Sequence, residues 1–179
     1  IPPDTPVPTV RVIVVTPTFT PRPIPTRTPR PTATPNASSY YNKGEEYYNA
    51  ENWAMAIGEF TNAIQLDPND ADAYHRRGRS YDRLGESQNA IADFDKAIQI
   101  EQNPTYLRNR GYSYKKLGQY QRAIQDYDKA IQLDPKYVSA YNSRGIAYKN
   151  LKQYQRAIQD YDKAIQLDPN YGLAYSNRG

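Results

Sequence analysis

One string of residues, QYQRAIQDYDKAIQLDP, occurs twice without change, at positions 119–135 and 153–169. The two copies lie 34 residues apart. Repetition at a short fixed interval is typical of arrays built from one small structural unit, because each unit buries its apolar side against a neighbour. The period therefore predicts four units. Their bounds are 37–70, 71–103, 104–137 and 138–171, with a partial fifth unit at 172–179.

Each unit carries the same skeleton of small and aromatic residues. In the third unit it consists of Gly111, Tyr114, Ala123, Tyr127 and Ala130. Residues three and four apart share one face of a helix, so the pattern predicts two helices in each unit. The small residues would let the helices approach closely, and the rings would fill the gaps between them. Leu-Asp-Pro closes three of the units, and proline cannot continue a helix from inside.

The period and this pattern resemble the tetratricopeptide repeat family over residues 37–179. The resemblance implies an all-α fold, a tetratricopeptide-type α-solenoid in which antiparallel helix pairs stack into a right-handed superhelix with a concave inner face. Two features depart from the family pattern. The second unit is one residue shorter, and Pro104 moves to the start of the next helix. A basic residue also precedes each recurring glycine, and we expect its aliphatic stem to cover apolar surface while its charge stays in water. These residues are Lys43, Arg77, Arg110, Arg144 and Arg178.

Residues 1–36 differ in composition and hold 11 of the 15 prolines and nine threonines. Such a stretch cannot bury enough apolar surface to offset its chain entropy, so we expect an extended Pro/Thr-rich N-terminal arm. Within it, residues 9–16 are rich in β-branched side chains and resemble a strand. We expect this segment to pair with strands from other copies, or with a domain outside this sequence, because strand pairing satisfies backbone groups in a way that a helical array cannot. Its apolar residues are Val10, Val12, Ile13, Val14 and Val15.

The boundary between arm and array carries a candidate modification site. Asn36-Ala37-Ser38 is an acceptor sequence for an N-linked glycan, which makes Asn36 a glycosylation candidate. The Thr-Pro surroundings also suit O-glycosylation. Both modifications favour an extracellular or cell-surface location. The alternative is an unmodified linker in a soluble cytoplasmic protein.

The formal net charge of +4 comes mostly from the arm. Residues 1–36 hold four arginines and one aspartate, whereas residues 37–179 hold 19 basic and 18 acidic side chains. A nucleic-acid-binding module needs a basic face, so this distribution argues against a nucleic acid partner. No apolar run approaches the ~20 residues that cross a bilayer, so no membrane span is expected. The chain has no cysteine, which excludes disulfides and thiolate chemistry.

No arrangement of reactive side chains indicates an enzyme. His75 is the only histidine, and its arginine neighbours disfavour a metal ion and lower its basicity. We expect it to be solvated at the surface. Carboxylates recur two residues apart, as in Asp126 and Asp128, and such residues point to different sides of a helix. We interpret them as a solvated face. The sequence predicts a non-catalytic protein without a metal ion or cofactor.

Binding is the function that remains. In the family that the repeats resemble, the first helix of each pair lines the concave face. Arg76, Arg79 and Arg83 would form a stripe there, at spacings of three and four. Guanidinium groups bind carboxylates through paired hydrogen bonds, so this stripe predicts an acidic peptide or a C-terminal carboxylate as a partner. The other candidates for the concave face are Tyr41, Tyr48, Arg108, Asn109, Tyr112, Lys116 and Asn142.

Three functions fit these observations: self-assembly, recruitment of an acidic partner segment, and a stalk-borne module of a larger envelope protein. The first is a structural, self-assembling protein, because the sequence stops at Gly179 within a predicted helix and leaves Leu173 and Tyr175 without a second helix to cover them. Copies would then stack head-to-tail into a filament, since a heterologous contact that does not close into a ring extends indefinitely. The arm would link the subunits. The alternative is an adaptor whose basic groove recruits an acidic segment, with the arm as a flexible tether.

Overall fold

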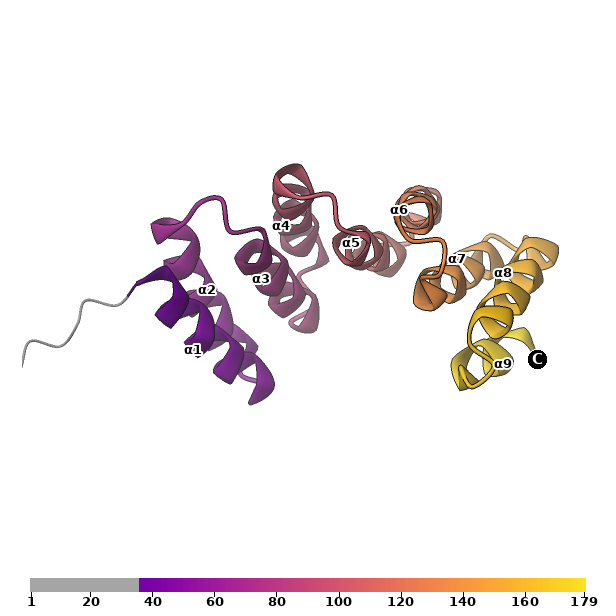
Figure 1. The fold of residues 1–179 in the computed structure, drawn as a ribbon, viewed down its shortest axis with the longest axis horizontal. Helices are drawn as coiled ribbons and strands as arrows, with labels where there is room; N and C mark the ends of the chain where they lie inside the picture. The colour runs from indigo at the N-terminus through magenta and orange to yellow at the C-terminus, as the bar shows by residue number, and fades with distance from the viewer. Residues whose placement is uncertain (1–35) are drawn as a thin grey trace, which may run out of the picture. The chain divides into compact units, whose positions relative to one another are not determined.

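The structure is a computed structural model and describes residues 36–179 (Figure 1). The predicted arm, with its strand-like segment 9–16, lies outside the described residues. Residues 36–179 form nine helices and no strand, which confirms the predicted all-α fold. In chain order the helices are α1 (Ala37–Asn49), α2 (Trp53–Leu66), α3 (Ala71–Arg83), α4 (Ser87–Ile100), α5 (Pro104–Lys116), α6 (Tyr120–Leu133), α7 (Val138–Asn150), α8 (Tyr154–Leu167) and α9 (Gly172–Arg178).

The helices form pairs that stack on one another, and a short turn joins the two helices of each pair (Figure 1). α1 packs against α2, α3 against α4, α5 against α6 and α7 against α8, and each pair contacts the next. Successive odd-numbered helices also touch, whereas no two even-numbered helices of the described region do. The odd-numbered helices therefore lie on the inner side of the array. This arrangement confirms the predicted solenoid.

An aromatic ring beneath each glycine sets the spacing within a pair. Phe60, Phe94, Tyr127 and Tyr161 are almost completely buried, and each lies against the recurring glycine of the facing helix. At Gly111, an added Cβ would stand 2.7 Å from Cε1 of Tyr127, well inside van der Waals contact. Only glycine lets α5 and α6 approach this closely, which explains why the residue recurs.

The turn inside each pair contains one residue with a left-handed backbone. This residue is Glu51 (φ 58°), Gly85 (φ 83°), Gly118 (φ 72°) and Lys152 (φ 60°) in the four successive pairs. Glycine adopts this conformation without steric cost, whereas a side chain costs roughly 1–2 kcal/mol. The first and fourth pairs thus place a charged residue where the middle two have glycine.

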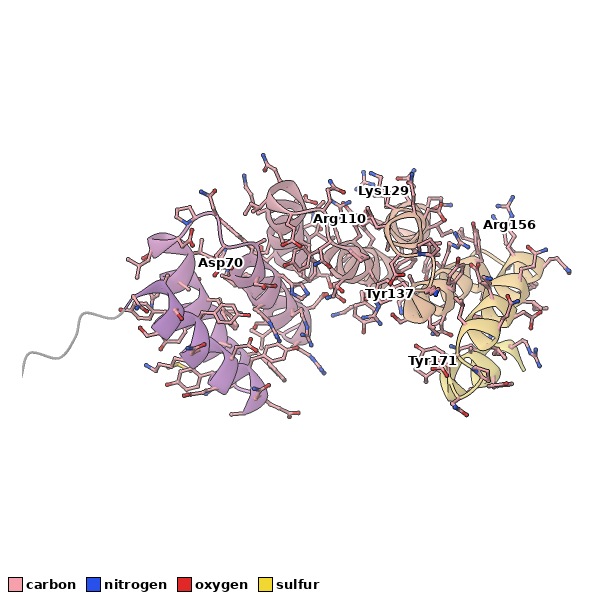
Figure 2. The ribbon with its side chains drawn as sticks, viewed as in Figure 1. Asp70, Arg110, Lys129, Tyr137, Arg156 and Tyr171 are labelled. Carbon is pink, nitrogen blue, oxygen red and sulfur yellow. The ribbon has the colours of Figure 1, made fainter. Side chains whose placement is uncertain are left out.

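The basic residues before the glycines form ion pairs, and at Arg77, Arg110 and Arg144 this corrects the expectation that the charge stays in water. Arg110, labelled in Figure 2, donates from Nε to Asp126 on α6 at 2.9 Å and from Nη2 to the other oxygen of that carboxylate. Its Nη1 donates to Asp95 on α4 at 2.6 Å. One guanidinium thus joins three helices. Arg77 and Arg144 make the same two-pronged pairing with their own second helix.

The repeated carboxylates therefore do not form one solvated face, and this corrects the interpretation made from the sequence. Asp93, Asp126 and Asp160 are buried beneath their arginines, whereas the aspartate two residues later is exposed. Burial raises the pKa of Asp93 and of Asp160, and the hydrogen bonds from their arginines lower it in part. An unpaired buried carboxylate would be strongly destabilising, so the arginines are part of the core.

His75 is buried rather than solvated, which is a second correction. Only 6% of its surface is exposed, and its ring lies 4.7 Å from that of Tyr106 and 5.9 Å from that of Phe94. Its Nε2 lies 2.7 Å from the side-chain amide nitrogen of Asn109 on α5, a geometry in which the neutral ring accepts a hydrogen bond. Burial, together with two nearby arginines, lowers the pKa of His75 to about 4. The side chain therefore holds α3 to α5.

We expect Gly111→Ala to lower the free energy of unfolding by about 1–3 kcal/mol, because the added methyl group forces Tyr127 or α5 to move. Gly58→Ala is the matched control. Gly58 lies inside α2, where an added Cβ meets no atom within 4 Å, so alanine should raise the stability by about 0.5–1 kcal/mol. Urea unfolding followed by circular dichroism measures both effects. A Gly111→Ala variant as stable as the unchanged chain would contradict the packing explanation.

We also expect stability to fall as the pH drops from 6.5 toward 4. In this window the unfolded state protonates His75, whose ordinary pKa is 6.5, while the folded state resists protonation down to about 4. Protons therefore favour unfolding, by about 1.4 kcal/mol for each unit of pKa difference. His75→Gln removes this contribution, and subtracting its pH profile separates His75 from the carboxylates that titrate nearby. If the urea midpoint depends on pH in the same way in the unchanged chain and in the His75→Gln variant, His75 does not cause the loss of stability.

Candidate protein-binding surface

Hydrogen bonds join successive odd-numbered helices along the inner side of the array. Between α3 and α5, the hydroxyl of Tyr106 donates to Asp72 at 2.7 Å, and the hydroxyl of Ser113 donates to Asp82. His75 and its amide partner lie between these two contacts along the helix. Some polar residues on the inner side therefore hold neighbouring repeats together, and the others remain available to a binding partner.

Four residues predicted for the concave face take part in such contacts. They are Arg76, which pairs with Glu45 at 3.2 Å; Asn109, which bonds to His75; Lys116, whose Nζ donates to the backbone oxygen of Asp82 at 2.7 Å; and Asn142, which accepts from Asn177 at 2.8 Å. Their polar groups hold the repeats together. Fewer of the predicted residues are therefore free to bind a partner than the sequence indicated.

A pocket between α3 and α5 brings together five of the ten residues predicted for the concave face. Its volume is about 270 Å³. The lining residues are Arg79, Asp82, Arg83, Phe94, Arg108, Asn109 and Tyr112. Pockets for cofactors and drug-sized ligands usually measure roughly 300–1,000 Å³. This smaller space suits the side chains of a bound polypeptide.

Positive charge predominates in this pocket. Its one carboxylate, Asp82, accepts hydrogen bonds from Ser87 and Ser113, and it lies 3.5 Å from Nζ of Lys116. The three arginines of the pocket form no ion pair within residues 36–179. Just outside it, burial and the charge of the neighbouring arginine lower the pKa of Lys115. The uncompensated guanidinium groups create a positive potential that attracts anionic groups.

Aromatic rings hold two of these arginines in place. The guanidinium carbon of Arg79 lies 4.9 Å from the ring centre of Tyr48, and that of Arg83 lies 5.3 Å from the ring centre of Trp53. Stacking orients the plane of the group and leaves its rim of N–H donors available. Nε of Arg108 is buried and has no hydrogen-bond partner in the described part of the chain.

The two predicted tyrosines of α1 pack against other rings. Tyr41 meets Phe60 edge-on at 5.7 Å, and Tyr48 meets Trp53 edge-on at 4.8 Å. Tyr48 is buried beneath Arg79 and so supports the pocket. Direct contact of either tyrosine with a partner stays a prediction.

The residues predicted for assembly and modification lie elsewhere. Leu173 and Tyr175 are exposed on α9, and the arm residues from Val10 to Val15 lie outside the described residues. Asn36 caps α1, since its side-chain oxygen accepts from the backbone N–H of Ser39 at 2.9 Å. The side chain is exposed, and its role as a glycan acceptor stays a prediction.

Phe94, which lines the pocket, and Trp53, which supports one of its arginines, were not predicted for it. Phe94 occupies a recurring aromatic position, which indicated burial but gave no sign that the ring lines a pocket. Trp53 begins α2 and supports Arg83 on α3. No short-range pattern links two residues that meet only because the first pair stacks on the second, so the sequence offered no signal for Trp53.

The structure also bears on membrane and metal binding. Every helix between residues 36 and 179 is too short or too polar to traverse a bilayer. In the same region, His, Asp and Glu side chains form no cluster of three that could hold a metal ion.

Comparisons with known proteins agree with the geometry. A family described as TPR repeat matches residues 44–85 and 111–152, and one described as Tetratricopeptide repeat matches residues 71–104 and 138–171. No curated protein matches the chain.

Several solved structures share the fold. A crystal structure of MamA is 24% identical over 75% of this chain and 80% of its own, with a TM-score of 0.70. A MamA fragment from Desulfovibrio magneticus RS-1 is 22% identical, with 79% and 81% covered and a TM-score of 0.73. The Arabidopsis OM64 TPR domain is 29% identical, with 60% and 90% covered and a TM-score of 0.58. Together, the matched repeats and the stacked helix pairs show that this chain belongs to the tetratricopeptide repeat family and is a scaffold for protein–protein interaction.

Proposed function

We propose that the scaffold binds an acidic segment of a partner protein in the pocket between α3 and α5. The observation that supports this most strongly is the convergence of Arg79, Arg83 and Arg108 on a pocket whose only carboxylate, Asp82, already has three partners. A site of this kind repels cations and binds carboxylates with little competition from its own acidic group.

The geometry favours carboxylate side chains over other anionic groups. A guanidinium group binds a carboxylate with two parallel hydrogen bonds, and stacking on Tyr48 and Trp53 already orders two of the three groups. The half-exposed ring of Tyr112 provides an apolar wall for the stems of glutamate or aspartate. An extended acidic segment could thus place one side chain in the pocket while its backbone crosses the inner side.

We expect the role to be non-catalytic. The only histidine bonds to Asn109 and is buried, and the buried aspartates are held by arginines. These groups already serve packing and are poorly placed to exchange protons with a substrate.

We expect Arg79→Gln together with Arg108→Gln to weaken the binding of a fluorescein-labelled oligoglutamate peptide at least tenfold, because each lost charge-assisted hydrogen bond contributes about 1.5–3 kcal/mol. Fluorescence anisotropy at physiological salt measures the affinity, and an oligoglutamine peptide of equal length tests the need for charge. The matched control is Arg122→Gln with Arg156→Gln, which removes the same charge from exposed positions outside the pocket. Equal weakening in both double variants would contradict a localised site.

A second candidate function is self-assembly into a filament. α6 and α8 have the same sequence, YQRAIQDYDKAIQL. Ile124 on α6 packs in a cluster with Ala147 of α7, whereas the equivalent Ile158 on α8 is 41% exposed and Tyr154 is 58% exposed. On the adjacent α9, Leu173 is 60% exposed. This apolar surface is the kind that a second copy could cover in a head-to-tail contact, with the arm linking subunits.

We expect Ile158→Glu combined with Leu173→Glu to abolish any filaments that the full chain forms, because buried apolar surface would be replaced by charge. Negative-stain electron microscopy and sedimentation velocity over a range of concentrations measure assembly. Met55→Glu with Leu66→Glu is the control, since both residues are exposed on α2. Val12→Asp with Val14→Asp tests the arm in the same assay. A chain that stays dispersed at all concentrations would exclude the filament.

A further inference from the structure

Charge is distributed unevenly along the array, although its sum is close to zero. Residues 37–103 hold 12 acidic and six basic side chains, a net charge of −6. Residues 104–179 hold six acidic and 13 basic side chains, a net charge of +7. The first two helix pairs are thus acidic, and the remainder of the array is basic. A near-neutral total conceals this polarity.

The polarity is sharpest along one edge, which we call the turn edge. It consists of the turns that follow α1, α3, α5 and α7, which share an edge because the odd-numbered helices stack side by side. The first two turns present two exposed carboxylates, Glu51 and Glu86, and one exposed cation, Arg83, while the exposed carboxylate of Glu46 lies in the last turn of α1. The last two turns, residues 115–122 and 149–156, contain no acidic residue. Their cations are Lys115, Lys116, Arg122, Lys149, Lys152 and Arg156.

Most of these cations are unpaired and held in similar positions. Only Lys116 forms an ion pair within residues 36–179. Arg122 and Arg156 each donate to a glutamine three residues earlier at 3.0 Å, and each guanidinium lies over a tyrosine ring, at 5.7 and 5.6 Å from its centre. Figure 2 shows Arg156 projecting away from α8. The two turns therefore present ordered, uncompensated positive charge to solvent.

We propose that two copies of this chain bind each other edge to edge, antiparallel, through the turn edge. A two-fold axis brings the acidic half of each edge against the basic half of the partner's edge, so the dimer contains two equivalent contacts between opposite charges. A parallel arrangement would place like charges together. A polyanion such as nucleic acid or an anionic membrane would meet the carboxylates of the first two turns, whereas a second copy matches both halves. The proposal does not depend on the pocket, which lies on the inner side.

The backbone of the turns provides variants that do not threaten the fold. Glu51 and Lys152 occupy the left-handed position that is Gly85 and Gly118 in the middle pairs. Glu51→Gly and Lys152→Gly therefore remove opposite charges from the edge while relieving backbone strain. Glu51→Lys introduces lysine at a left-handed position, and the equivalent position of the fourth pair, Lys152, already accommodates that residue.

The test is sedimentation equilibrium of the full chain at low and high salt. At low salt we expect a closed dimer, twice the 20.5 kDa of the chain. The dissociation constant should rise at least about tenfold in ~0.5 M salt, where charges are screened within a few ångströms. Lys152→Glu with Arg156→Glu, and separately Glu46→Lys with Glu51→Lys, should each weaken the dimer about tenfold or more. Glu51→Gly and Lys152→Gly should weaken it to a smaller extent.

Mixing the two charge-reversed chains is the decisive measurement. In one chain the fourth turn then becomes acidic, and in the other the first turn becomes basic, so each reversed turn meets an opposite charge in the mixed pair and the two chains should form a heterodimer at least as tight as the unchanged pair. Lys129→Glu with Lys136→Glu is the control, since it makes the same change in net charge away from the turn edge and should leave the dimer intact. A monomer at low salt, failure of the reversed chains to pair, equal loss in the control, or binding to anionic vesicles in place of the dimer would overturn the proposal. Growth beyond a dimer that persists in high salt would instead indicate the apolar filament contact.

Discussion

The contact between a glycine and the ring beneath it determines the geometry of each repeat. Because Gly111 carries no side chain, α5 lies close above Tyr127. The residues that precede these two, Arg110 and Asp126, are thereby brought within reach of a two-pronged ion pair. The third donor of the same guanidinium extends to Asp95 on the preceding pair. Packing inside one repeat thus positions the guanidinium group of Arg110, which attaches that repeat to the preceding one. The stacking of repeats in turn places the odd-numbered helices side by side and so forms the inner side of the array.

The second half of the array has a basic surface because its basic residues outnumber its acidic ones, 13 to six. Residues 104–179 contain six carboxylates, and four of them are bound by arginines that connect helices. The other two, Asp134 and Asp168, accept hydrogen bonds from backbone N–H groups in the turns between pairs. Few acidic groups therefore remain to balance the lysines and arginines at the surface. The net charge of +7 for residues 104–179 shows the same excess, since the four paired carboxylates and the three arginines that bind them nearly cancel.

The sequence was sufficient to predict the helix pairs and their stacking, because the repeat fixes positions that depend on local spacing. The sequence did not predict which polar residues are buried or which partners they bind. His75 and the charge of Arg110 were expected in water, whereas His75 is buried and Arg110 is partly buried, since their partners, Asn109 and Asp126, lie on other helices and are brought near only by stacking. Five of the ten residues proposed for the concave face do meet in one pocket. Four of the ten hold neighbouring repeats together, a role that depends on a residue in the adjacent repeat.

Position in the repeat, rather than residue type, decides what an arginine does in this chain. Before a glycine, Arg110 is a structural ion-pair partner. On the inner side, Arg79 stacks on a ring and keeps donors free for a ligand. In the turn, Arg156 reaches solvent. Since these three positions do not overlap, a repeat array can vary its pocket and its edge without disturbing the contacts that stack its units. A binding site for an acidic segment and a self-complementary edge can therefore occur in one small scaffold, each removable by substitutions that leave the other in place.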